Sequence, residues 1–166
     1  MPVLAFPGPV APAPPAVTLE VPEGWEPVPA GAGLLRARGT GSAGDLVEVG
    51  VAAHTAAGVD ASVLVDGLTS ASAPAGSELE DVFVVEIGGR EWAARNVSWD
   101  EPGGPVVEVA LVSLVDETPA EGATGATGAA ADRFVVATGR VRGVGLEADY
   151  DTLQSVLETI VVGERP

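Results

Sequence analysis

Hydrophobic and polar residues alternate through the middle of the chain, and this period of two is typical of half-buried β-strands. The segment 46–54 shows it clearly, since Val47, Val49 and Val51 fall on one face and Glu48 on the other. Strands are likewise predicted at 82–87, 90–99, 106–115 and 133–142, with shorter ones at 17–21 and 160–164.

Glycine-rich turns connect these strands in sequence order. Gly88 and Gly89 separate two of them, and such a link suits a type I′ hairpin because glycine accepts positive φ. The segment 99–105 forms the next hairpin turn. Successive strands joined by tight turns pair antiparallel, so we expect an antiparallel sheet of about six or seven strands.

Two segments follow the helical period instead. In 60–72 apolar residues recur at i, i+3, i+4 and i+7, and Asp60 is the predicted N-cap. In 148–160 a similar apolar stripe begins beside Asp149, the second predicted cap. Two main helices flanking an antiparallel sheet give an α+β layer architecture.

The composition limits both the number of domains and the chemistry. The chain has 166 residues and no cysteine, and 46% of it is hydrophobic. This length suits one domain, and the lack of cysteine excludes disulfides, thiolate catalysis and cysteine-bound zinc. We divide the chain into a proline-rich N-terminal extension, 1–16, and a single domain, 17–166. The glycine-rich segment 121–132 is predicted to be a loop.

The charge decides which partners are expected. Eight basic residues stand against twenty-four acidic ones, and the formal charge is −16. A nucleic-acid binder needs a basic face, so we expect no nucleic acid. The negative charge is explained by solubility or, alternatively, by attraction to a basic partner. No apolar run reaches the ~18–20 residues that span a bilayer, so we expect no integral membrane segment.

The first sixteen residues bear on location. They lack the basic start of a secretory signal, and prolines interrupt their apolar run. As written, the chain is predicted to be cytoplasmic. A chain from which a signal had been removed would instead be extracytoplasmic.

Few residues could carry a reaction. His54 is the one histidine, and no Gly-x-Ser-x-Gly elbow accompanies it. Residues 143–148, GVGLEA, match the glycine pattern of nucleotide-binding turns, but Asp149 places negative charge where a phosphate would sit. We therefore predict no catalytic residue, no cofactor and no metal site. The alternative is a small-molecule carrier or weak hydrolase centred on His54.

Trp25 is one of three tryptophans and lies in the proline-rich segment VPEGWEPVP, 21–29. Gly24 permits a sharp bend, after which Trp25 can fold back onto the sheet and bury its indole. The flanking prolines lack the basic residue of a proline-recognition peptide. We therefore interpret Trp25 as a structural anchor.

Three segments, taken in order, resemble a known family: VTLEVPEGWEPVP, GGREWAARNVSWD and RFVVATGRVRGVGLEADYDTLQSVLETIVV. Together they resemble the PsbP/Mog-type family and, more narrowly, its actinobacterial LpqN/LpqT-like branch, over about residues 17–162. The resemblance implies an α/β/α sandwich and a mostly non-enzymatic role, since members include a photosystem subunit, a Ran-binding factor, secretion-effector chaperones and lipoproteins. This chain lacks the signal and the lipidated cysteine of the lipoprotein branch.

We therefore expect a non-catalytic protein-binding, chaperone or adaptor module, not an enzyme, whose partner is basic or a secreted effector. The predicted contact residues are Trp99, Arg140 and Arg142. The two arginines share one face of the strand 133–142, and Arg and Trp often dominate interface energies. Alternatively, both arginines only neutralise neighbouring acids and Trp99 belongs to the core.

Overall fold

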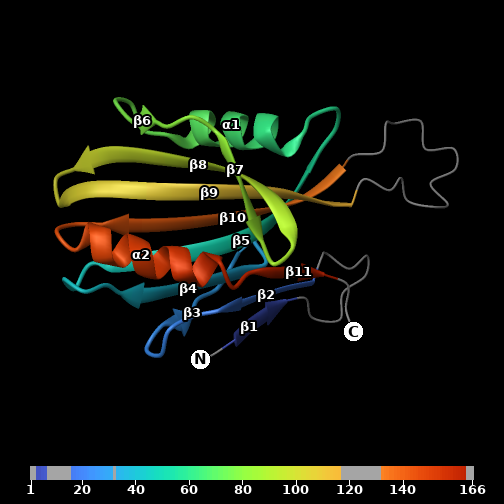
Figure 1. The fold of residues 1–166 in the computed structure, drawn as a ribbon. Coiled ribbons are helices and arrows are strands. Elements are labelled where there is room, and N and C mark those ends of the chain that lie inside the picture. The colour runs from blue at the N-terminus through green and yellow to red at the C-terminus, as the bar shows by residue number, and fades with distance from the viewer. Residues whose placement is uncertain (1–2, 7–15, 32, 117–131, 164–166) are drawn as a thin grey trace, which may run out of the picture.

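One wide antiparallel sheet organises the molecule (Figure 1). The structure is a computed structural model that describes residues 3–6, 16–31, 33–116 and 132–163. The strands are β1 (Val3–Phe6), β2 (Ala16–Glu20), β3 (Glu26–Pro27), β4 (Leu35–Thr40), β5 (Leu46–Ala56), β6 (Glu78–Leu79), β7 (Phe83–Ile87), β8 (Arg90–Glu101), β9 (Gly104–Asp116), β10 (Asp132–Arg142) and β11 (Val161–Gly163). The helices are α1 (Ala61–Ser72) and α2 (Leu146–Leu157). Of the predicted loop at 121–132, all but Asp132 lies outside the described residues.

The strands form two sheets, and the described pairings are antiparallel. The larger sheet has eight strands, in the order β3-β4-β5-β10-β9-β8-β6 with β7 also paired to β8. The smaller sheet has the order β1-β2-β11. The predicted α+β class is confirmed, whereas the predicted strands did not include β1, β3, β4 or β6.

The predicted glycine hairpin joins β7 to β8. Gly88 and Gly89 have φ angles of 61° and 78°, the positive values that a type I′ turn requires at both central residues. The pairing starts with Ile87 opposite Arg90, directly beside the turn. This short link fixes the register of the whole hairpin.

Two helices cover opposite faces of the larger sheet. α1 packs on β8 and β9, where Leu64 and Val65 are buried against Phe134 of β10. α2 and the smaller sheet cover the other face. Asp60 caps α1 as predicted, since its Oδ1 accepts a hydrogen bond from the N–H of Val63 at 2.9 Å. Neither helix in this part of the chain is long and apolar enough to cross a membrane.

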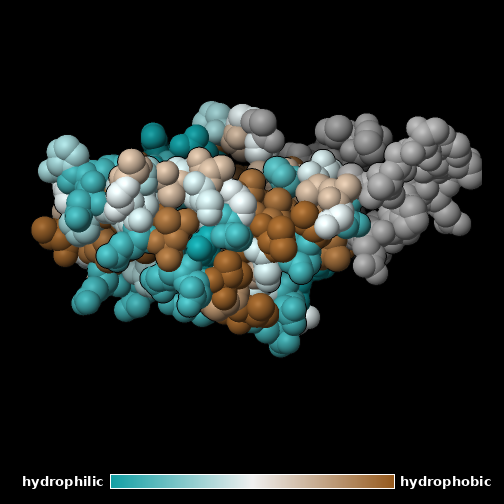
Figure 2. Space-filling view, turned by 90° about the horizontal axis from the view of Figure 1, so that it is seen from above, coloured by the Kyte–Doolittle hydropathy of each residue, from teal (hydrophilic) through white to brown (hydrophobic). Residues whose placement is uncertain are grey.

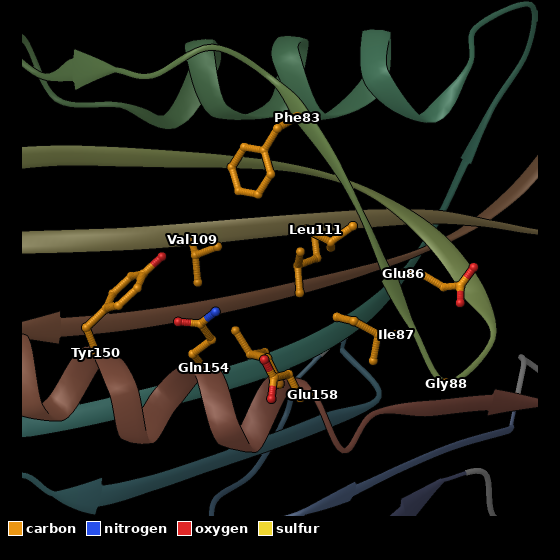
Figure 3. A pocket seen from close by; sticks show the side chains of 11 residues that line it. Phe83, Glu86, Ile87, Gly88, Val109, Leu111, Tyr150, Gln154 and Glu158 are labelled. Atoms are coloured by element: carbon orange, nitrogen blue, oxygen red, sulfur yellow. The ribbon is translucent and has the colours of Figure 1, made fainter.

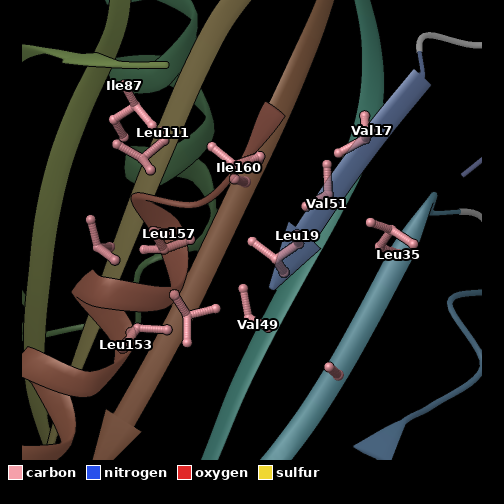
Figure 4. Close-up of a cluster of buried hydrophobic side chains, with 14 of the residues drawn as sticks. Val17, Leu19, Leu35, Val49, Val51, Ile87, Leu111, Leu153, Leu157 and Ile160 are labelled. Atoms are coloured by element: carbon pink, nitrogen blue, oxygen red, sulfur yellow. The ribbon is translucent and has the colours of Figure 1, made fainter. Parts of the chain in front are cut away.

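The larger hydrophobic core lies on the α2 face of the sheet (Figure 4). β2 contributes Val17 and Leu19, and α2 contributes Leu153 and Leu157; each is at most 3% exposed. The three valines of β5 that were predicted to share one face are buried in the same cluster. The period of two therefore identified the core face of β5 correctly.

α2 begins earlier than predicted. Its first residue is Leu146 and its N-cap is Gly145, so Asp149 lies one turn inside the helix and is not the cap. Asp149 is 3% exposed, and its Oδ1 accepts a hydrogen bond from the backbone N–H of Ser42 at 2.7 Å. The carboxylate of Asp149 therefore binds a segment more than 100 residues away instead of capping the helix, as the local sequence had predicted it would.

β2 belongs to the smaller sheet and not to the larger one. It pairs with β1 on one side and with β11 on the other, so the two ends of the described chain meet there. β1 falls within residues 1–16, the predicted extension, and residues 7–15 lie outside the described part. The first and last strands therefore close the α2 face together.

Trp25 lies against the backbone of β4. The indole is half-buried and packs on the larger core, so it is less buried than the predicted anchor. Gly24 has a φ of 90° and supplies the predicted bend. A Cβ at Gly39 would overlap the indole ring, so the missing side chain is what lets the ring lie so close to the strand.

This contact predicts a non-additive pair of substitutions. Gly39→Ala should lower the free energy of unfolding by about 1–3 kcal/mol in the wild type, because its methyl group overpacks against Trp25. In a Trp25→Ala background, which itself loses about 2 kcal/mol because the indole is only half-buried, the same change should be nearly neutral.

Urea unfolding measures all four proteins of this cycle. Gly50→Ala on neighbouring β5 is the matched control, since a Cβ there meets nothing closer than 3.8 Å. Equal costs for Gly39→Ala with and without the indole would contradict the packing described here.

Candidate functional site

The three predicted contact residues lie together on the α1 face of the sheet, beyond the end of α1. β9 runs between them, so Trp99 of β8 and Arg142 of β10 both lie opposite Val106. Arg140 lies opposite Glu108 in the next row of the same face. The sheet therefore brings these three residues into one cluster, the Trp99 cluster.

Each arginine of the Trp99 cluster is bound to a glutamate. Arg140 donates to Oε2 of Glu108 from Nε at 3.0 Å and from Nη2 at 2.6 Å. Its guanidinium carbon also lies 5.1 Å from the centre of the Trp99 ring, within cation–π range. Glu101 accepts from Trp99 Nε1 at 2.9 Å and from Arg142 Nη1 at 3.5 Å.

The ion pairs decide what the Trp99 cluster offers to a partner. Two arginines are balanced by two glutamates, so these ion pairs leave the cluster no net positive charge. Its arginines neutralise neighbouring acids, and Trp99 is half-buried. A protein-contact role for these residues stays a prediction.

His54 lies near the end of β5, opposite Phe134, and is half-exposed. It lines none of the four cavities that the described residues form most clearly. Among those residues, no three His, Asp or Glu side chains gather as metal ligands. The geometry around His54 thus gives no support to the carrier or hydrolase alternative.

The first three residues of the GVGLEA segment, 143–145, form the turn between β10 and α2, and the last three begin α2. Gly143 has a φ of 87°, and a Cβ there would overlap the carboxylate of Asp45. A Cβ at Gly145 would come within 2.6 Å of the Ser42 hydroxyl. These glycines allow the β4–β5 turn to pack closely against the start of α2, which is a structural reason for the motif.

A groove between α2 and β7 is the feature that the sequence did not predict. Its volume is about 480 Å³, and Val109 and Leu111 of β9 form its floor (Figure 3). Phe83 of β7 and Tyr150 of α2 point toward this floor from opposite sides. The other lining residues are Val85, Glu86, Ile87, Gly88, Gln154, Leu157 and Glu158.

Tyr150 brings one polar group into the groove wall. Its hydroxyl donates to Oδ1 of Asn96 at 3.0 Å. Burial raises the pKa of the Tyr150 phenol, and the carboxylates of Glu80 and Asp151 act in the same direction, against the hydrogen bond to Asn96. The phenol is therefore protonated at neutral pH and serves as a neutral hydrogen-bonding group, not as a base.

One signal in the sequence could have revealed the groove. Segment 82–87 begins with four consecutive apolar residues, so both faces of this strand are apolar. A strand of that kind needs cover on both faces, which the edge of a sheet does not supply. In the structure Phe83 is 40% exposed and Val84 is 55% exposed, and apolar side chains reach the surface on this side of the molecule (Figure 2).

Comparison with known proteins supports the fold. No protein-family model matches the sequence, and no curated protein matches it. The structure is similar to that of LpqN, which is involved in cell envelope biogenesis of Mycobacterium tuberculosis, with a TM-score of 0.67 and 13% identity over 98% of this chain and 92% of LpqN. A solved structure from Bacteroides thetaiotaomicron matches with a TM-score of 0.51 and 13% identity, over 90% of this chain and 46% of that chain. An LpqN-like fold is therefore confirmed, and membership of the PsbP/Mog family stays a prediction.

The Trp99 cluster predicts a specific stability effect. Arg140→Glu should lower the free energy of unfolding by about 1.5–3 kcal/mol, because it removes the charged donors of Glu108 and adds a carboxylate beside it. Exchanging the pair, Arg140→Glu with Glu108→Arg, should restore most of this loss. Urea unfolding gives each value.

Arg38→Glu is the matched control. Arg38 forms an ion pair with Glu26 at 3.3 Å, but both side chains are more than half exposed, so its reversal should cost less than about 1 kcal/mol. If Arg140→Glu is no more costly than Arg38→Glu, the pair with Glu108 contributes nothing beyond an ordinary surface contact.

Proposed function

We propose that this chain is a non-catalytic protein-binding module and that the groove between α2 and β7 holds its partner. The observation that carries the proposal is the groove of about 480 Å³ between these two elements, whose floor, Val109 and Leu111, is apolar and whose wall includes Phe83, 40% exposed. Concave apolar sites with few polar groups are typical ligand sites, and exposed apolar surface beside them marks sites of protein contact.

The surface around the groove favours a protein partner over a small molecule. Apolar exposure continues along β7 beside the groove, where Phe83 and Val84 are 40% and 55% exposed. A small ligand would leave that surface in water, whereas a polypeptide can cover it together with the groove. A small apolar ligand within about 480 Å³ is the competing occupant.

The similarity to LpqN supports an envelope-related role for the chain. LpqN is involved in cell envelope biogenesis, and we propose an envelope-related binding role for this chain too. That role would place the protein outside the cytoplasm, in place of the cytoplasmic location expected from the sequence as written. Chaperone or adaptor activity would be carried out by the same groove.

Selection of peptides from a random display library on the immobilised protein tests the proposal. Peptides selected on the wild type should lose about tenfold or more in affinity for Gln154→Trp, because Gln154 is an exposed residue of α2 that lines the groove. Ser155→Trp, on the neighbouring exposed position of α2 outside the groove, should bind them as the wild type does.

Two results would overturn the proposal. One is selection of peptides that bind Gln154→Trp and Ser155→Trp equally well, since the groove is then not their site. The other is failure to select any peptide while a library of small apolar compounds raises the melting temperature of the wild type but not of Gln154→Trp. That outcome would make the chain a small-molecule carrier.

A further inference from the structure

β7 has one strand partner among the described residues, and that partner is β8. In Figure 3, β8 lies on one side of β7 and the groove lies on the other, toward α2. The unpaired edge of β7 therefore borders the groove. An unpaired strand edge presents backbone N–H and C=O groups that can bind another strand.

The hairpin register identifies which of these groups are free. Ile87 lies opposite Arg90 across a two-residue turn, and such a pair exchanges both of its backbone hydrogen bonds. Since hydrogen-bonded positions alternate along the strand, the backbone N–H and C=O groups of Phe83 and Val85 also face β8. The N–H and C=O groups of Val84 and Glu86 then face the groove.

We propose that the partner binds by adding an antiparallel strand to the free edge of β7, inside the groove. This inference rests on the proposed function, and it specifies the backbone of an extended segment as the recognised group. The added strand would lie between β7 and α2, with every second side chain directed at Val109 and Leu111. The backbone contacts provide affinity, and the groove selects the side chains.

The charge beside β7 specifies the sequence of that strand. Glu86 lies directly opposite Glu91 of β8, and two like charges in this position repel each other. Both side chains are exposed, neither forms an ion pair within the described residues, and Glu158 lines the same groove. A basic side chain on the added strand, next to Glu86, would relieve this repulsion.

The complete pattern of the segment follows from its neighbours. Opposite Phe83, Val84 and Val85 it should carry apolar residues, and opposite Glu86 a basic one. A second basic residue, opposite Ile87, would face the groove that the carboxylate of Glu158 lines. In the antiparallel direction this reads as two basic residues followed by three apolar ones. A second copy of this chain would instead bring another Glu86 and a further formal charge of −16, so self-association through β7 is disfavoured.

A synthetic peptide tests strand addition directly. The probe is fluorescein-labelled Arg-Arg-Val-Ile-Leu-Ser-amide, with binding followed by fluorescence anisotropy. Methylating the backbone nitrogens of its second and fourth residues removes the N–H groups that face β7, and affinity should fall about tenfold or more. Methylating the third and fifth nitrogens instead should leave affinity within about twofold.

The protein side of the test uses two acid-to-amide changes. Glu86→Gln and Glu91→Gln both remove the like-charge pair, so neither should lower the melting temperature. Only Glu86→Gln should weaken probe binding, by about threefold or more, because only Glu86 lies beside the added strand. Equal effects of the two variants on binding would contradict the proposed position of the basic residue.

The outcomes separate this inference from the proposed function. If both methylated probes bind as the unmodified probe does, strand addition is wrong, while binding in the groove stands. If the probe fails to bind but display selection yields groove-binding peptides, the basic–apolar sequence is wrong. If neither binds, the proposed function fails as well. Concentration-dependent dimers in sedimentation, lost in a Val84→Lys variant, would make a second copy the occupant and overturn the inference.

Discussion

The position of α2 on the sheet depends on the missing side chain of Gly139. Leu153, which is fully buried, occupies the space where a Cβ of Gly139 would lie, at 2.5 Å from its nearest methyl group. This contact sets how closely the helix approaches β10. The position of α2 in turn determines the positions of the groove wall, the buried Asp149 and the chain leading into β11.

The two faces of the larger sheet are covered to different extents, and this explains where the charges lie. α2 and the smaller sheet cover one face, whereas α1 covers only part of the other. The uncovered part carries ion pairs between strands, such as Arg36 with Glu48 and Arg140 with Glu108. Four of the eight arginines form such pairs between strands, and the lining residues of the groove on the opposite face are apolar, neutral or acidic. The negative electrostatic potential of the chain is therefore uneven over the surface. It is strongest where no arginine is near.

The parts of the fold that local patterns determine could be predicted from the sequence. The valines of β5, the Gly88–Gly89 turn and the Asp60 cap each depend on neighbours within a few residues, and all three were predicted correctly. The start of α2 was wrong because a distant amide binds Asp149. The pairing of β2 with β1 and β11 was missed because partner choice depends on which edges remain free after the larger sheet forms.

The site was harder to predict than the fold because it too depends on contacts between distant segments. Trp99, Arg140 and Arg142 were expected to lie near one another, and the alternation of β10 together with the hairpin makes that possible from the sequence. Their pairing with Glu101 and Glu108 depends on register across three strands. The groove combines side chains from β7, β9 and α2, so it exists only once these elements are packed.

The hydrogen bond from Ser42 to the buried Asp149 also connects an exposed turn to the buried face of α2. Ser42 belongs to a turn, and amides in turns usually exchange with solvent through small local fluctuations. Here the acceptor is a helix side chain, 107 residues away in the chain and 3% exposed. The Ser42 amide can exchange only when this hydrogen bond breaks, so its protection reports the contact between the β4–β5 turn and the helix that forms one wall of the groove.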